Sequence, residues 1–210
     1  LRWLNGAFAD SLGRELPEPV ALLPLACDSL RDGDDCHGRT IAGTRMLSAR
    51  LAAMYDLSLE VKNFLATSPS FFLNLWMAAS KCMLAACDGI NDSSLITAAG
   101  ANGSTTGIQI AGLPGRWFVH HADPPKCKFD DDSLPKSRAL GAIGDSAIVD
   151  ALGFGAMAMN YAPEQQKNLQ AFMPVDGLSL PDRLLSVLHP AFGALKLKVG
   201  MLARTIVDDG

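Results

Sequence analysis

The segment Phe71–Ala86 constrains the fold of this chain most, because it is apolar on almost every side of a helix. Ser68 and Pro69 precede it, in the order expected of a helix N-cap and a first helical position, and Asp88-Gly89 follow its end. A helix without a polar face is stable in water only when its surroundings bury it. The pattern therefore predicts a buried central helix against which other parts of the chain pack.

Around this helix the sequence alternates helical patterns with one strong strand signal. Two β-rich runs, 106–111 and 116–121, flank a Gly-Leu-Pro-Gly turn and predict a β-hairpin over 106–121. Helical spacing before the hairpin predicts helices over 22–31, from Asp34 or Asp35 to about residue 56, and over 93–101. After the hairpin, one helical pattern runs from Gly144 to about Tyr161, a second begins at Pro163, and a third runs from Pro181 to near His189. Residues 195–199 are typical of a strand, and a final helix follows them.

These patterns predict a helix-rich α+β fold with a buried central helix, a β-hairpin and a small sheet. Residues 1–90 form the mostly helical part of this prediction, and residues 91–210 form the α+β part. Leu1 is not a natural start, so we interpret both parts as portions of one longer protein.

Charge and cysteine usage restrict the classes of function. The formal net charge is −4 and no basic stripe occurs, which argues against a nucleic-acid partner. The longest apolar segment, 63–80, is interrupted by Pro69, so no membrane partner is expected. Five cysteines without a C-x-x-C spacing are typical of a reducing compartment, which predicts a cytoplasmic location.

The densest polar cluster is the segment Gly33–Thr40. If a helix begins at Asp35, His37 and Arg39 lie in its first turn, where free backbone N–H groups attract anions. A cation there opposes the helix dipole, so Arg39 indicates an anionic ligand, with Asp34 and Thr40 beside it. His37 could polarise a carbonyl or transfer a proton near neutral pH. The alternative is a capping loop in which Arg39 pairs with Asp34 or Asp35.

The residues of this segment give little support for a bound metal or cofactor. Asp34, Asp35 and His37 are possible metal ligands, but adjacent carboxylates rarely point at one ion, and no second histidine motif follows. Cys36 and His37 are sequence neighbours, which seldom face each other as a nucleophile pair does. No nucleotide-binding or zinc motif occurs elsewhere. The sequence therefore predicts neither a metal nor a cofactor.

Three further places could bind an anion. The turn of Gly144, Asp145 and Ser146 feeds a helix N-terminus and could expose backbone donors, although plain N-capping is the common role of such residues. Arg116 at the hairpin end could clamp a carboxylate or phosphate, or could be a charge on an edge strand. Asn74 lies inside the buried central helix and must find partners, and a ligand is one option.

Four strings then occur in order: G-D-D-C-H-G-R-T (Gly33–Thr40), F-F-L-N-L-W-M-A-A-S-K (Phe71–Lys81), T-G-I-Q-I-A-G-L-P-G-R-W-F (Thr106–Phe118) and I-G-D-S-A-I (Ile143–Ile148). With these motifs the chain resembles the bacterial YlbE-like, or AllG-like, family over about residues 19–210. Members are usually longer than this chain. The matching motif positions are Asp34, His37, Arg39, Asn74, Lys81, Arg116, Trp117, Gly144, Asp145 and Ser146.

The resemblance implies an activity and partners. Members include a subunit of oxamate carbamoyltransferase, which acts with partner subunits in allantoin breakdown and phosphorolyses oxalurate to oxamate and carbamoyl phosphate. The implied substrate is a small anionic amide or ureide, used with phosphate or carbamoyl phosphate. The implied assembly is a homo- or hetero-oligomer.

The leading hypothesis is therefore a carbamoyltransferase-type subunit in which Arg39, Arg116 and the Gly144 turn bind anions and His37 polarises a carbonyl or shuttles a proton. Two alternatives stay open, a non-catalytic assembly subunit and a small-acid-binding protein. Convergence of Arg39, Arg116 and Ser146 on one pocket would favour the enzyme. The same residues held in separate salt bridges would favour the assembly subunit.

Overall fold

The computed structural model describes residues 18–126, 135 and 138–209, and it has the expected α+β class. Its helices are α2 (Leu22–Arg31), α3 (Ile41–Met54), α4 (Leu59–Thr67), α5 (Phe71–Ala85), α6 (Ala147–Leu152), α7 (Pro163–Leu169), α8 (Leu180–Leu184) and α9 (Ala203–Asp209), with 3-10 segments η3 (Gly155–Tyr161) and η4 (Pro190–Leu195). Its strands are β1 (Ile96–Asn102), β2 (Thr105–Ile110), β3 (Phe118–His121), β4 (Ile143–Gly144), β5 (Leu185–Leu188) and β6 (Lys198–Met201).

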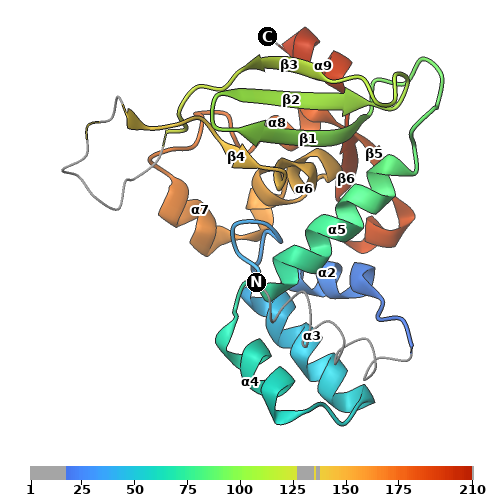
Figure 1. Cartoon of the computed structure of the whole chain (residues 1–210), viewed down its shortest axis with the longest axis vertical. Helices are drawn as coiled ribbons and strands as arrows, with labels where there is room; N and C mark the ends of the chain where they lie inside the picture. Colours follow the sequence, from blue (N-terminus) through green and yellow to red (C-terminus); the bar gives the residue numbers. More distant parts are fainter. Residues whose placement is uncertain (1–17, 127–134, 136–137, 210) are drawn as a thin grey trace.

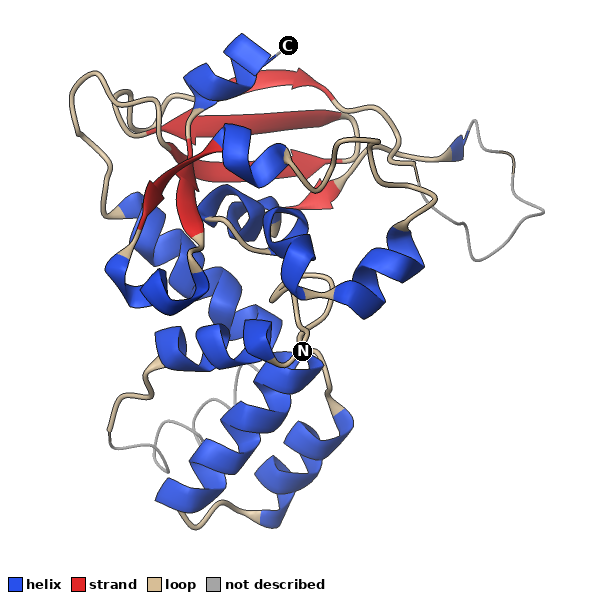
Figure 2. Ribbon diagram, turned by 180° about the vertical axis from the view of Figure 1, so that it is seen from behind, coloured by secondary structure: helices blue, strands red, loops and turns tan. Residues whose placement is uncertain are grey.

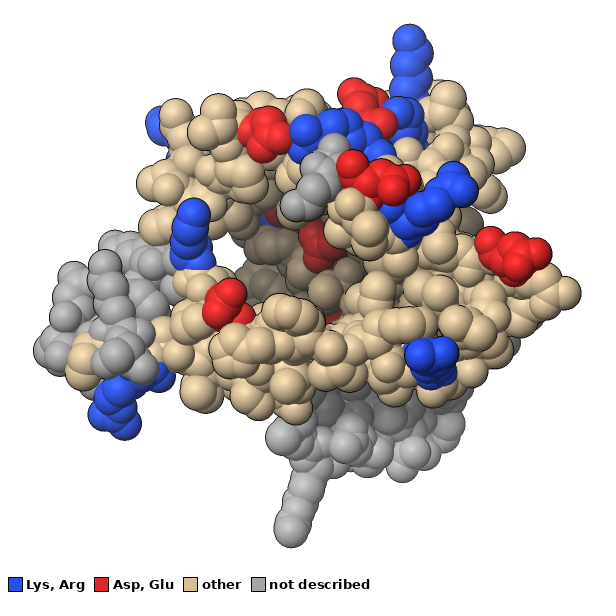
Figure 3. All heavy atoms as spheres, turned by 90° about the horizontal axis from the view of Figure 1, so that it is seen from above, with Lys and Arg blue, Asp and Glu red and all other residues tan. Residues whose placement is uncertain are grey.

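The elements form a helical end and a sheet end joined through α5. Helices α2, α3 and α4 lie together below, the four-stranded sheet lies above, and α5 and α6 run between them (Figure 1). The same division is visible from behind, where α9 stands above the sheet at the C-terminal end (Figure 2). Seen from above, the surface is hollowed near its middle, with acidic side chains inside the hollow and basic ones along part of its rim (Figure 3).

Helix α5 is the predicted central helix, but it is buried along one stripe and not on most sides. The buried residues are spaced four apart: Phe72, Trp76, Ser80 and Leu84. Asn74 lies outside this stripe and is exposed, and its amide donates to the carbonyl of Phe71 at 3.3 Å. The expectation that Asn74 is buried was wrong, because only one side of α5 packs against α2, α3, α6 and β1.

The main sheet has the strand order β3-β2-β1-β4 and is antiparallel throughout. The predicted hairpin is confirmed as β2 and β3, with Ile108 opposite Phe118 and Thr105 opposite His121. The predicted helix over 93–101 was wrong, because this segment contains β1. Its alanines favour a helix locally, but pairing with β2 and β4 on both sides of the strand overrides that preference.

Three other boundaries differ from the sequence prediction for identifiable reasons. Helix α3 begins at Ile41 because Cys36 has a left-handed φ of 63°, which prevents a helix from running through 35–40. The expected helix over 144–161 divides at Gly153, whose φ is +125° and whose added Cβ would lie 2.6 Å from the carbonyl oxygen of Lys198. Residues 185–188, expected to be helical, pair with β6 as strand β5.

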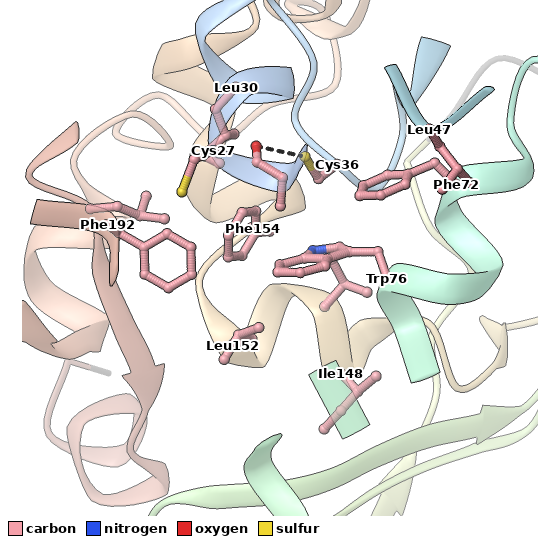
Figure 4. Packing of buried hydrophobic residues seen from close by; sticks show 14 of the residues in the cluster. Cys27, Leu30, Cys36, Leu47, Phe72, Trp76, Ile148, Leu152, Phe154 and Phe192 are labelled. Atoms are coloured by element: carbon pink, nitrogen blue, oxygen red, sulfur yellow. Dashed lines mark hydrogen bonds between the residues drawn. The ribbon is translucent and has the colours of Figure 1, made fainter. Parts of the chain in front are cut away.

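A row of aromatic rings runs through the core and joins α5 to the segment after α6 and to η4. Trp76 stacks on Phe72 at 6.1 Å between ring centroids and meets Phe154 edge-on at 4.7 Å. Phe154 in turn meets Phe192 at 5.4 Å, and Cys36 lies beside this row with its thiol directed at the carbonyl of Ala26 (Figure 4). The row fixes α5 and the segment after α6 relative to each other, and these two elements position the site.

Candidate functional site

The 33–40 loop is held together by the carboxylates of its own two aspartates. Oδ1 of Asp35 accepts hydrogen bonds from the backbone N–H groups of His37 at 2.6 Å and Arg39 at 3.0 Å. Oδ2 of Asp34 accepts from the backbone N–H of Gly43 at 2.8 Å, in the first turn of α3. The side chain of Asp34 therefore caps α3 from outside the helix. It occupies backbone N–H donors of the first turn to which an anionic ligand would otherwise bind.

Arg39 is engaged by carboxylates on both sides. Its Nε lies 3.6 Å from Oδ1 of Asp34, and a terminal nitrogen lies 3.1 Å from Oε2 of Glu164 on α7. Burial raises the pKa of Asp34, while hydrogen bonds from Gly43 and Ala42 and the charge of Arg39 act in the opposite direction. The arrangement matches the capping-loop alternative, in which Arg39 pairs with Asp34.

His37 pairs with a carboxylate from another element. Its Nδ1 lies 2.7 Å from Oδ2 of Asp150 in α6, and Oδ1 of Asp150 accepts from the backbone N–H of Ala156 at 2.7 Å. The hydrogen bond to Asp150 raises the pKa of His37 above its usual value, although burial lowers it. Gly155 permits this approach, because an added Cβ would lie 2.9 Å from the His37 ring nitrogen. The pair ties the loop to the end of α6.

A separate pocket of about 390 Å³ lies between α5, α6 and the inner face of the sheet. Its walls come from three of the four motif segments and from β1: Met77, Ala78, Lys81, Ala98, Ala99, Gln109, Trp117, Asp145 and Ile148. The pocket thus gathers residues that are up to 71 positions apart in the chain, from Met77 to Ile148. Such convergence of polar groups among apolar walls is typical of small-molecule sites.

Two polar side chains of this pocket, those of Lys81 and Gln109, are oriented by neutral backbone groups. Nζ of Lys81 donates to the carbonyl of Thr97 at 2.8 Å, and no ion pair of Lys81 occurs in the part of the chain that the structure describes. Oε1 of Gln109 accepts from the backbone N–H of Gly115 at 3.3 Å, which leaves its amide NH₂ available. Asp145 supplies a carboxylate to the same pocket.

The site residues predicted from the sequence fall into three places. Asp34, His37, Arg39 and Thr40 lie in the 33–40 loop, where Thr40 is buried. Asp145 lines the pocket, next to Gly144, which pairs with Ala101 at the sheet edge, and Ser146, which precedes α6. Arg116 lies outside both groups, 5.0 Å over the ring of Phe118, and Asn74 is exposed on α5. Arg39, Arg116 and Ser146 do not line one described pocket.

Sequence reasoning missed residues that matter in both places. Lys81 and Trp117 were recognised as motif positions but not as pocket residues, and Gln109 was not singled out. Lys81 had a usable signal, because it is a cation on an otherwise apolar helix. Asp150 had a similar signal, because it is the only carboxylate of α6.

Two kinds of structure are absent from residues 18–126, 135 and 138–209. Within those ranges, no cluster of three or more histidine, cysteine, aspartate or glutamate side chains could hold a metal ion. None of the helices in the described part of the chain has the length and apolar character needed to cross a membrane.

Fold and pocket together define an α+β protein with a small, mainly apolar cavity that contains a few polar side chains, between a helix pair and an antiparallel sheet. The model of the family described as oxamate carbamoyltransferase subunit AllG matches residues 1–146, so the chain belongs to that family. The resemblance identified from the four motifs is thereby confirmed.

Known proteins similar to this chain are considerably longer. The oxamate carbamoyltransferase subunit AllG of Escherichia coli (strain K12) is 32% identical over 173 residues, which are 77% of this chain and 41% of that protein. The uncharacterized protein YahG of the same strain is 36% identical over 151 residues, 69% of this chain and 32% of YahG. A crystal structure of a conserved protein of unknown function from Enterococcus faecalis V583 superposes with a TM-score of 0.76 at 26% identity, covering 91% of this chain and 49% of that one. The chain therefore spans less than half the length of each.

Proposed function

We propose that this chain is part of a carbamoyltransferase-type subunit, and that the pocket between α5 and the sheet binds a small anionic amide or ureide. The observation that carries the proposal is the convergence of three motif segments on this pocket, where they bring together Lys81, Gln109 and Asp145. Membership of the AllG family supports the reaction class.

The charges of the pocket suit a ligand that has an anionic end and an amide end. Lys81 is held by a neutral carbonyl, so its positive charge is available to a carboxylate or phosphate. The free NH₂ of Gln109 can donate to a carbonyl oxygen, and Asp145 can accept from an amide N–H. Two donors and one acceptor match the groups of oxamate or oxalurate.

In this proposal His37 and Arg39 have a structural role and not the catalytic role expected from the sequence. Both are engaged by carboxylates of the same chain, Asp150 for His37 and Asp34 with Glu164 for Arg39. This observation favours the second candidate function, a non-catalytic assembly subunit whose polar motifs maintain its structure. Ligand binding at Lys81 separates the two candidates.

The test is thermal unfolding of the full-length protein, alone and with its partner subunits, in the presence of oxamate, oxalurate, carbamoyl phosphate or phosphate. We expect at least one of these to raise the melting temperature of the wild type and of Lys62→Met, a matched exposed control on α4. Lys81→Met should abolish that shift while unfolding normally without ligand. Absence of any shift in the wild type, with and without partners, would establish the assembly alternative instead.

A further inference from the structure

Trp117 covers one side of the pocket and rests directly on the sheet. It stands just before β3, it is 48% exposed, and it lines the pocket together with Gln109 and Lys81. A Cβ added at Gly107, on the neighbouring strand, would lie 3.1 Å from Cε3 of the indole. The glycine therefore permits the ring to lie against the backbone of β2, with part of its surface left for a ligand.

The segment that carries Trp117 is fastened to the body of the protein. The backbone N–H of Gly115 donates to Oε1 of Gln109 at 3.3 Å, and that of Gly112 donates to the carbonyl of Ser93 at 2.9 Å. The N–H of Arg116 donates to the carbonyl of Leu113 at 3.2 Å, which closes the turn. The backbone that carries Trp117 is consequently held in place before any ligand arrives, and the indole lies against Gly107 of β2.

We propose that Trp117 is the specificity-determining residue of this pocket and that it selects ligands with a planar carbon skeleton. The inference rests on the proposed function, because it concerns the ligand of the same pocket. An indole presents a flat, polarisable surface, and a conjugated acid amide can lie parallel to it with its carboxylate at Lys81 and its N–H at Asp145. A tetrahedral carbon next to the carboxylate projects a substituent towards the ring and prevents this contact.

The experiment compares a planar and a tetrahedral probe of similar size and equal charge, oxamate and lactate, by calorimetric titration of the full-length protein. Wild type should bind oxamate more tightly, and Trp117→Leu should reduce the lactate-to-oxamate ratio of dissociation constants about fivefold. Trp117→Phe, which keeps a flat ring, should retain most of the ratio. Its melting temperature also verifies that the pocket still folds.

Fluorescence provides a second readout that a structural role would not give. Of the two tryptophans that the structure describes, Trp76 is fully buried, so ligand contact should alter the emission of Trp117. Trp117→Phe should lose the emission change on adding oxamate while keeping the calorimetric signal. If wild type binds oxamate and Trp117→Leu discriminates as wild type does, the Trp117 inference is wrong and the proposed function stands. If wild type binds neither probe nor any ureide, both fail together.

Discussion

The 33–40 loop and the pocket are linked through α6, yet they use their polar side chains in opposite ways. In the loop, Asp34, Arg39 and His37 each have an ion-pair or hydrogen-bond partner within the chain, while Oδ1 of Asp34, Nε of Arg39 and Oγ1 of Thr40 are buried without a hydrogen bond among the described residues. In the pocket, Lys81 and the NH₂ group of Gln109 can still bind a ligand, because the backbone contacts of these two side chains leave donors available. A dense run of charged residues in the sequence thus corresponds here to internal structure, while the ligand-competent groups are dispersed along the chain.

This difference has a physical basis. Charged groups that are close in sequence can neutralise one another locally, and a buried carboxylate such as Asp34 is stable only with such partners. Groups that remain free for a ligand are better separated, because a neighbouring opposite charge would compete with the ligand. Mutations that remove polar groups should therefore change stability in the loop and binding in the pocket.

Asp34→Ala should have the largest effect on stability. It removes the acceptor for Gly43 and leaves Arg39 without its buried partner, which we expect to cost about 3 kcal/mol of unfolding free energy. Urea unfolding measures this loss. The matched control is Asp32→Ala, whose exposed pair with Arg45 should contribute less than about 0.5 kcal/mol. Equal losses in the two variants would contradict a structural role specific to Asp34.

Arg39→Ala should destabilise the protein and leave ligand binding intact. Removing the guanidinium leaves Asp34 buried without a nearby cation, at an expected cost of about 2 kcal/mol. The ligand that stabilises wild type should still raise the melting temperature of this variant by a similar increment. Loss of the ligand response with little change in stability would move the anion site from the pocket to the loop.

The His37–Asp150 pair should stabilise the protein more at about pH 6 than at about pH 9. The pKa of His37 is higher in the folded state than in the unfolded state. The protonated ring therefore adds its full stabilisation of the fold below the unfolded-state pKa, and this stabilisation is lost as pH rises through the folded-state pKa. A double-mutant cycle with His37→Gln and Asp150→Asn should give a coupling of about 1 kcal/mol at the lower pH. A coupling that is independent of pH would show that the neutral ring makes the contact.

Arg116→Ala should have the smallest effect of the series. Its guanidinium lies over Phe118 in an exposed position, so the expected loss of stability is below about 0.5 kcal/mol. Binding measured by calorimetry should match that of wild type. A weaker affinity for the ligand would extend the anion site from the pocket around the edge of the sheet.

Much of the architecture could be predicted from the sequence, since its strongest signals are local. The apolar run of α5 and the Gly-Leu-Pro-Gly turn each predicted the correct element. Strand β1 could not be predicted in this way, because its residues take extended structure through pairing with strands that follow later in the chain. The start of α3 depended on the left-handed φ of Cys36, which non-glycine residues adopt only in particular surroundings.

The candidate site was less predictable than the fold, for a related reason. Asp145 was identified beforehand, but the pocket around it also requires Gln109 and Lys81, from β2 and α5. Likewise, His37 attracted attention as a titratable residue, while its partner Asp150 lies 113 positions later, from residue 37 to residue 150. Sequence spacing carries information about neighbours on one element, and these pairs depend on how separate elements pack.

Strand β1 has an irregularity between Ile96 and Ala98, where its register against β2 shifts by one residue. Thr97 occupies this position, and its carbonyl is the one that accepts from Lys81. The length of β1 is therefore under stronger constraint than its composition: deleting one residue here would restore a regular ladder and remove the irregularity that presents this carbonyl to Lys81. Over evolutionary time this strand should accept exchanges of one small residue for another, while insertions and deletions accumulate in other parts of the chain.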